Sequence, residues 1–247
     1  MKTLSDIKNW EEMIGEVMNA DCLELMKMLP DKSIDLVIAD PPYNLIGLDN
    51  FIDLGTYRKW SKLWIEECFR VLKWNGTFIL CGRPPVLSYL IVDICEMGKV
   101  FREMITWNKI DSITLAREYH SRNYEQFAIF SNWMERTFNY IPIESESKNY
   151  GKERNIGSIW SHCKISSHHK EGTEHPTQKP IMFLKRFIET YTNETDLVLD
   201  PFMGSFTTAI AAESLGRKWI GCDISEKYCQ IGAERLRILR SQPKLIL

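Results

Sequence analysis

The segment Asp40-Pro41-Pro42-Tyr43 ends an apolar run, residues 34–40, and combines a carboxylate, two prolines and an aromatic ring. Proline lacks a backbone N–H and fixes its own φ, so this segment is held extended, with the Asp40 carboxylate and the Pro41 carbonyl as paired acceptors. Two such acceptors match the two N–H protons of an exocyclic amine on a flat ring that stacks on Tyr43. The pairing frees the amine's lone pair to attack an electrophile. The alternative is an ordinary proline-rich turn with an aspartate cap.

A second strand end carries related chemistry. The stretch LVLDPFMGSFTT, residues 197–208, has the order strand, acidic end, small-residue turn and helix, which is the layout of a nucleotide-type cofactor loop. Asp223 follows Asp200 by 23 residues, at the end of the next expected strand. In dinucleotide-binding units an acidic residue about 20 positions on accepts hydrogen bonds from ribose hydroxyls. The two features together predict a site for a nucleoside-containing cofactor.

Alternating strands and helices must position these segments. Hydrophobic patterns predict strands at residues 16–19, 34–40, 77–81, 104–108, 126–130, 197–200 and 218–223. They predict helices at 22–30, 58–73, 181–192, 207–216 and 226–240. The alternation is typical of a doubly wound, mostly parallel α/β sheet, in which ligands bind outside the carboxyl ends of the strands.

Residues 131–174 interrupt the pattern, because they are polar, rich in Ser, Asn, His and charge, and have few periodic apolar positions. We expect a small inserted recognition region there, within a single domain that spans residues 1–247. Between residues 145 and 185 seven cations face four acids, a local net charge of +3. This patch is suited to contacts with phosphate groups.

Composition narrows the classes of protein. With 31 Lys and Arg against 33 Asp and Glu, the formal net charge of −2 argues against a protein that coats nucleic acid through bulk charge. No run of about 18 apolar residues and no apolar N-terminal signal is present, so we expect a cytoplasmic protein. The seven cysteines include no CxxC pair, which indicates neither a disulfide framework nor a thiolate zinc site. The spacing of the remaining metal-ligand types also matches no common zinc pattern, so we expect no metal at His162, Cys163, His168 and His169.

Five separated blocks in one order resemble the permuted β group of DNA amino-methyltransferases. They lie between about residues 17 and 239 and read NADCLELMKMLPDKSIDLVIADPPYN, FRVLKWNGTFIL, ITWNK, GSIW with HPTQKP, and DLVLDPFMGSFTTAIAAESLGRKWIGCDIS. The DPPY block precedes the cofactor loop, an order that separates this group from glutamine and ribosomal-RNA methyltransferases. The resemblance implies a circularly permuted, seven-stranded, Rossmann-like methyltransferase sheet and S-adenosyl-L-methionine as the methyl donor.

The resemblance also assigns roles to residues. Asp223 would bind the ribose hydroxyls of the cofactor, and Asp21 its adenine amino group. The other cofactor-binding residues that it implies are Cys22, Asp40, His175, Thr177, Gln178, Lys179, Asp200, Pro201, Phe202, Gly204, Ser205, Thr207 and Ile224. The target base would be held by the expected catalytic residues, Asp40, Pro41, Pro42 and Tyr43.

The implied activity is that of a site-specific DNA adenine methyltransferase, from a restriction-modification system or a phage, acting on a flipped-out base. Aspartate at the first motif position favours adenine in this family, whereas serine favours cytosine. A cytosine amino-methyltransferase is the alternative, since the same pocket accepts either amine. DNA contacts are expected from Arg117, Arg122, Lys148, Lys152, Arg154, Lys164 and Lys170. The expected partner is double-stranded DNA, and candidate further partners are a second copy of the chain and a cognate restriction endonuclease that acts separately.

One position departs from the family pattern. The loop is commonly DPFxGSGTT, but Phe206 stands at the second glycine. We expect a ring there to crowd the cofactor or to hold the following helix off the sheet. A catalytically silent DNA- or cofactor-binding relative is therefore a second alternative. On this interpretation Phe206→Gly tightens cofactor binding.

Overall fold

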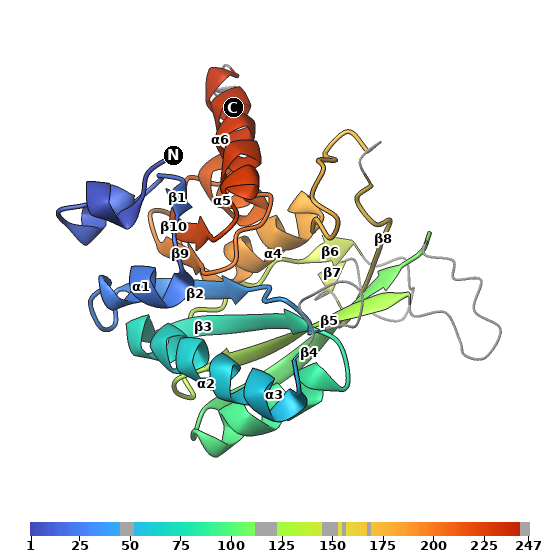
Figure 1. Ribbon diagram of the computed structural model, residues 1–247. Helices are drawn as coiled ribbons and strands as arrows, with labels where there is room; N and C mark the ends of the chain where they lie inside the picture. The colour runs from blue at the N-terminus through green and yellow to red at the C-terminus, as the bar shows by residue number, and fades with distance from the viewer. Residues whose placement is uncertain (45–51, 112–122, 145–152, 155–156, 167–168, 243–247) are drawn as a thin grey trace.

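An eight-stranded sheet forms the centre of the computed structural model, which describes the chain except for residues 45–51, 112–122, 145–152, 155–156, 167–168 and 243–247. The strand order is β1-β10-β9-β2-β3-β5-β4-β8 (Figure 1). These strands are β1 (Met18–Asn19), β2 (Ile34–Ala39), β3 (Leu72–Gly82), β4 (Val100–Lys109), β5 (Tyr124–Ser131), β8 (Ile159–His162), β9 (Leu197–Asp200) and β10 (Lys218–Asp223). A separate antiparallel pair consists of β6 (Ile143–Glu144) and β7 (Glu153–Arg154).

The sheet is mostly parallel, which confirms the predicted fold class. β5 runs antiparallel to its neighbours β3 and β4, and the other described pairs are parallel. The carboxyl ends of β2, β9 and β10 therefore share one edge with the amino end of β5. The sheet has one strand more than the expected seven, because β8 pairs with β4 from within the polar stretch 131–174. Its four residues are too few to show a hydrophobic period.

In the part of the chain that the structure describes, six α-helices flank the sheet, and they cover both of its faces (Figure 1). They are α1 (Cys22–Lys27), α2 (Leu54–Val71), α3 (Val86–Glu96), α4 (Ile181–Tyr191), α5 (Thr207–Ser214) and α6 (Glu226–Ser241), and short 3-10 turns span Leu4–Asp6 and Trp10–Met13. The sequence pattern did not predict α3, although its buried Leu87, Leu90 and Ile94 have helical spacing. Across the described residues, no helix has the length and apolar character needed to cross a membrane.

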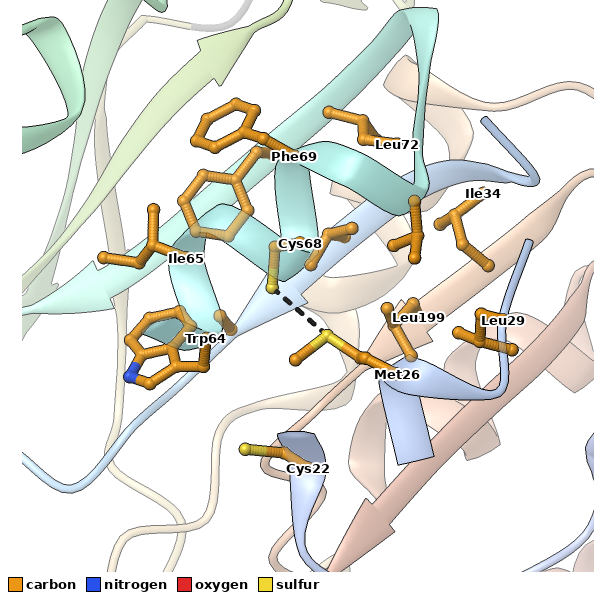
Figure 2. Packing of buried hydrophobic residues seen from close by; sticks show 14 of the residues in the cluster. Cys22, Met26, Leu29, Ile34, Trp64, Ile65, Cys68, Phe69, Leu72 and Leu199 are labelled. Carbon is orange, nitrogen blue, oxygen red and sulfur yellow. Dashed lines mark hydrogen bonds between the residues drawn. The ribbon is translucent and has the colours of Figure 1, made fainter. Parts of the chain in front are cut away.

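One core lies between the sheet and helices α1, α2 and α3. Figure 2 shows α1 and α2 side by side, with the Cys68 thiol 3.7 Å from the Met26 sulfur. Trp64, Phe69 and Leu199 are buried around this contact. Because interiors are close-packed, these side chains fix the position of α2 over the sheet. Because α2 is the first described helix after the DPPY segment, this packing also limits where that segment can lie.

A second core on the opposite face of the sheet joins β8, from the polar stretch 131–174, to α4 and β5. The Trp160 ring of β8 lies 4.8 Å from the Phe187 ring and 5.4 Å from the Phe183 ring, both on α4. Phe127 of β5 contacts the same two rings. Aromatic contacts of this kind contribute about 0.5–1.5 kcal/mol beyond their buried area. β8 is thus a packed part of the main domain.

Candidate functional site

A cavity of about 500 Å³ opens at the sheet edge where β2, β9 and β10 end. Its volume lies within the usual range for small-molecule sites. Every residue expected to catalyse or to bind the cofactor lines it, which brings together segments from both ends of the chain. The lining also includes side chains that the sequence patterns did not single out, among them Trp60, Cys81, Phe127 and Tyr228.

Two carboxylates on one side of the cavity are anchored by backbone amides. Asp223 accepts hydrogen bonds from Gly204 N and Ser225 N, each at 2.8 Å. Its burial raises the pKa of this carboxyl. Asp21 caps helix α1 by accepting from Leu23 N at 2.9 Å. Each carboxylate has further lone pairs that can accept donors from a ligand.

Asp200, at the end of β9, shapes the cofactor loop. It is 3% exposed and accepts hydrogen bonds from Phe202 N at 2.9 Å and from the Thr208 hydroxyl at 2.5 Å. Burial raises its pKa to about 7, although the two hydrogen bonds act in the opposite direction. A cation placed in the cavity therefore stabilises the ionised form of Asp200.

Gly204 permits a close contact that closes the loop. Its φ is +51°, and a Cβ at this position would lie 2.7 Å from His175 Nε2, so a larger residue would strain the backbone and displace the His175 ring. The His175 ring packs edge-on against Tyr228 with ring centroids 4.5 Å apart. Burial lowers the pKa of His175 to about 4, so this ring lines the cavity in its uncharged form at pH 7.

The segment between His175 and α4 is held by its own side chains. Gln178 accepts a hydrogen bond from the Thr173 hydroxyl at 2.8 Å and donates to the Glu171 carbonyl at 2.6 Å. Thr177 N donates to His175 Nδ1 at 3.4 Å. These contacts turn the next residue, Lys179, toward the DPPY segment.

The DPPY segment holds its carboxylate between two donors. Asp40 Oδ1 accepts from the Tyr43 hydroxyl at 2.7 Å, and Oδ2 accepts from Lys179 Nζ at 2.5 Å. The Tyr43 hydroxyl also lies 2.9 Å from Cys81 Sγ. Burial and the nearby Asp40 raise the pKa of Tyr43 well above its usual value, so the phenol stays protonated. The Tyr57 hydroxyl fixes the turn by donating to the Pro42 carbonyl at 2.5 Å.

Sequence analysis missed Glu125, which is 3% exposed beside this pair. Its carboxylate lies 2.5 Å from Lys109 Nζ, 3.3 Å from Lys179 Nζ and 3.4 Å from Arg83 Nη2. Burial alone raises its pKa, but the surrounding cations lower that pKa to about 2. A charged residue at the start of the apolar run 126–130 was the available signal, since buried carboxylates need partners.

The expected crowding of the cofactor by Phe206 is wrong. Its ring is fully buried, and Phe206 is absent from the described residues that line the cavity. The backbone is left-handed at φ 60°, and the ring packs against Trp219 and into space left by Gly232 of α6. A Cβ on Gly232 would lie 2.3 Å from the ring. Helix α5 begins at Thr207 and packs on the sheet strand β10, so the ring does not displace it.

The residues expected to contact DNA are only partly described. Lys164 and Lys170 are exposed. Arg154 lies on β7. Outside the described residues lie Arg117, Arg122, Lys148 and Lys152, together with His168 from the group weighed as metal ligands. DNA contact by this region stays a prediction.

Comparison with family models gives one match, a DNA methylase model of the N6/N4 type that covers residues 34–234. Among curated relatives, the type II methyltransferase M.HpaI of Haemophilus parainfluenzae is 35% identical over 88% of this chain and 72% of its own length. The DNA adenine methyltransferase YhdJ of Escherichia coli (strain K12) is 30% identical over 90% of this chain and 82% of its own.

Solved structures share the fold. The complex of M1.HpyAVI with S-adenosylmethionine aligns with a TM-score of 0.65 at 25% identity, covering 90% of this chain and 98% of that one. The cytosine-N4-specific PvuII DNA methyltransferase aligns with a TM-score of 0.72 at 21% identity, covering 94% and 87%. The second likeness concerns the fold alone.

Proposed function

The chain belongs to the N6/N4 DNA methylase family, and from this premise we propose that it methylates the exocyclic amino nitrogen of adenine in a specific DNA sequence. The cofactor of the family is S-adenosylmethionine. The observation that carries the proposal is that the cofactor loop and the Asp40 acceptor face one cavity. A methyl donor and an amine are thereby held within reach of each other.

The lining residues fit this cofactor. Asp21 and Asp223 offer acceptors for amino and hydroxyl groups, while Phe202 and the exposed Ile224 offer apolar surfaces for a ring. When bound, the cofactor supplies a methyl group activated on a sulfonium centre. Ionised Asp200 would add negative potential to the cavity that holds such a cation.

The DPPY segment would act on the base. The Asp40 carboxylate and the Pro41 carbonyl accept hydrogen bonds from the two N–H groups of the amine. The nitrogen lone pair is then no longer delocalised into the ring and is available for attack. The Tyr43 hydroxyl donates to Asp40, and Tyr43 lines the same cavity, so its ring would stack on the base. The ammonium formed on methylation is acidic, and Asp40 is the proposed acceptor of its proton. No separate base is needed before attack.

Adenine is the proposed target because the motif begins with aspartate and because the related YhdJ is a DNA adenine methyltransferase. Cytosine is the second candidate, since its amino group presents the same two protons to the same acceptors. The cytosine-N4-specific PvuII enzyme shares the fold but is too distant in sequence to favour this base.

The proposed partner is DNA, read by residues 131–174, with exposed Lys164 and Lys170 at phosphates. The base would be flipped out of the helix to reach Asp40. A homodimer, a separately acting cognate endonuclease and a cytoplasmic location are proposed with it.

Transfer of a labelled methyl group to unmethylated DNA, followed by nucleoside analysis, tests the proposal. We expect N6-methyladenine. N4-methylcytosine would establish the second candidate. Absence of transfer, with cofactor still bound, would identify a silent relative.

A further inference from the structure

We propose that Glu125, acting through Lys179, is a positioning residue that holds Asp40 at the site of the target amine; this rests on the proposed function. Asp40 would touch the substrate, whereas Glu125 lies behind it and acts only through another side chain. The argument starts from where these charges lie in the sheet.

Glu125 stands at the amino end of β5, directly opposite Trp107 of β4 in the antiparallel pair. Because β5 is antiparallel to β3, its amino end lies at the same sheet edge as the carboxyl end of β2, which Asp40 directly follows. The residues that follow, Phe127 and Ile129, are buried in the core. A carboxylate at this position pays a large desolvation cost, which only close cations offset.

Lys179 is the link between the two carboxylates. Its ammonium lies 2.5 Å from Asp40 Oδ2 and 3.3 Å from Glu125 Oε2, and the side chain is 7% exposed. An ammonium has three donors, so it can serve both acceptors at once. Lys179 is also the last residue before Pro180 and α4, in the segment that lines the cofactor cavity. Its position is therefore set from both sides.

The cluster would be unbalanced without Glu125. Two carboxylates, Asp40 and Glu125, face three cations, Lys179, Lys109 and Arg83. Burial alone lowers the pKa of Lys179, but Asp40, Glu125 and Cys81 raise it above its usual value, so it stays charged. With Glu125 neutralised, Lys179 keeps Asp40 as its one anionic partner among these groups. The ammonium then loses its second anchor, Glu125, so it no longer holds the Asp40 carboxylate at the place where that carboxylate meets the amine.

The Tyr43 hydroxyl adds a second, weaker connection. It donates to Asp40 and lies 3.5 Å from Glu125 Oε2. Glu125 thus contacts both groups that donate to Asp40. A Glu125 that only stabilised the fold would need Lys109, its nearest cation, but would not need to contact Lys179 and the Tyr43 hydroxyl.

The test separates a positioning role from a structural one. Glu125→Gln removes the charge but leaves Lys109 buried without its partner, which itself destabilises the fold. The double variant Glu125→Gln/Lys109→Met deletes both members of that pair, so the fold is expected to recover. Glu103→Gln is the control. Glu103 on β4 also pairs with a cation, since its carboxylate lies 3.1 Å from Arg136 Nη2, but Glu103 is absent from the described residues that line the cavity.

We expect the double variant to melt near the wild-type temperature and to bind cofactor with unchanged affinity. Its turnover at saturating cofactor and DNA should still be reduced about 100-fold, the loss typical of a misplaced reacting group. The control should keep wild-type turnover.

Wild-type turnover in the folded double variant would overturn the proposal, and so would failure of the double variant to fold, because Glu125 would then be a requirement of the fold. These results differ from failure of the proposed function, in which the wild type itself transfers no methyl group to DNA.

Discussion

The two halves of the cavity are built in different ways. On the proposed cofactor side, Asp200 and Asp223 each accept from a backbone amide two residues on, Phe202 N and Ser225 N. On the proposed base side, Asp40 bonds to the nearby Tyr43 and also to Lys179, 139 residues away, and the Tyr43 hydroxyl lies 3.5 Å from Glu125, 82 residues from it. Local turns make the first half, and buried ion pairs between distant segments make the second. We therefore predict that substitutions on the base side lower turnover without changing cofactor affinity, and that substitutions on the cofactor side change cofactor affinity.

The largest effect is expected at Asp40. Asp40→Ala should reduce turnover by about 1,000-fold or more, as removal of a preorganised polar group at a reacting centre does. Calorimetry should show cofactor affinity within a few-fold of the wild type, since the cofactor loop is anchored elsewhere. Asp93→Ala is the matched control, because Asp93 pairs with Arg58 at the same 2.5 Å distance outside the cavity. Substantial turnover in Asp40→Ala would contradict the proposed role of Asp40 in holding the target amine.

The cofactor half is also held by packing of Phe206 against Gly232. Gly232→Ala should destabilise the protein by about 1–3 kcal/mol in chemical denaturation, because the new methyl overlaps the ring. In a Phe206→Gly background the same change should become neutral or stabilising by about 0.5–1 kcal/mol, the ordinary gain of alanine over glycine in a helix.

Equal effects of Gly232→Ala in both backgrounds would contradict the packing account. Contrary to the expectation from the family pattern, Phe206→Gly should weaken cofactor binding, because a flexible glycine replaces a residue whose buried ring holds the loop.

Asp21 allows a matched comparison between two helix caps. Asp21 caps α1 and Asp53 caps α2 through the same kind of hydrogen bond. Replacing either with alanine should cost about 1 kcal/mol of stability. Only Asp21→Ala should also raise the cofactor dissociation constant, by about tenfold, through loss of an acceptor in the cavity. Equal affinities in the two variants would remove Asp21 from the cofactor site.

The last expected effect is a pH dependence that belongs to the proposed cofactor half. Burial raises the folded-state pKa of Asp200 to about 7, above the usual value for an aspartate, so the folded state binds more protons than the unfolded state. Stability should therefore fall as pH rises between about 4 and 7. A cationic ligand favours ionised Asp200, so cofactor affinity should rise with pH up to about 7, by at most tenfold per unit. Asp200→Asn should flatten both profiles; unchanged slopes would assign them to another group.

The same contrast explains what the sequence could predict. The strand-turn-helix pattern at 197–208 and the spacing to Asp223 join neighbours in the chain, so they indicated the loop and the carboxylate that line the cavity. Asp21 and the segment 175–179, which also line it, followed only from the resemblance to the family. Glu125 and Lys109 are brought to Asp40 only by strand order, which no local pattern contains. Phe206 was misjudged for a related reason: its space comes from Gly232, on another helix. β8 was missed because its pairing with β4, rather than its composition, makes it a strand.

A strand-resolved methylation map of DNA from cells that express the chain tests the central claim most directly. The account predicts N6-methyladenine at one recurring sequence in cells with the wild-type chain, and none at that sequence in cells with the Asp40→Ala variant. Methylation at cytosine, or adenine methylation that persists in the Asp40→Ala cells, would contradict it.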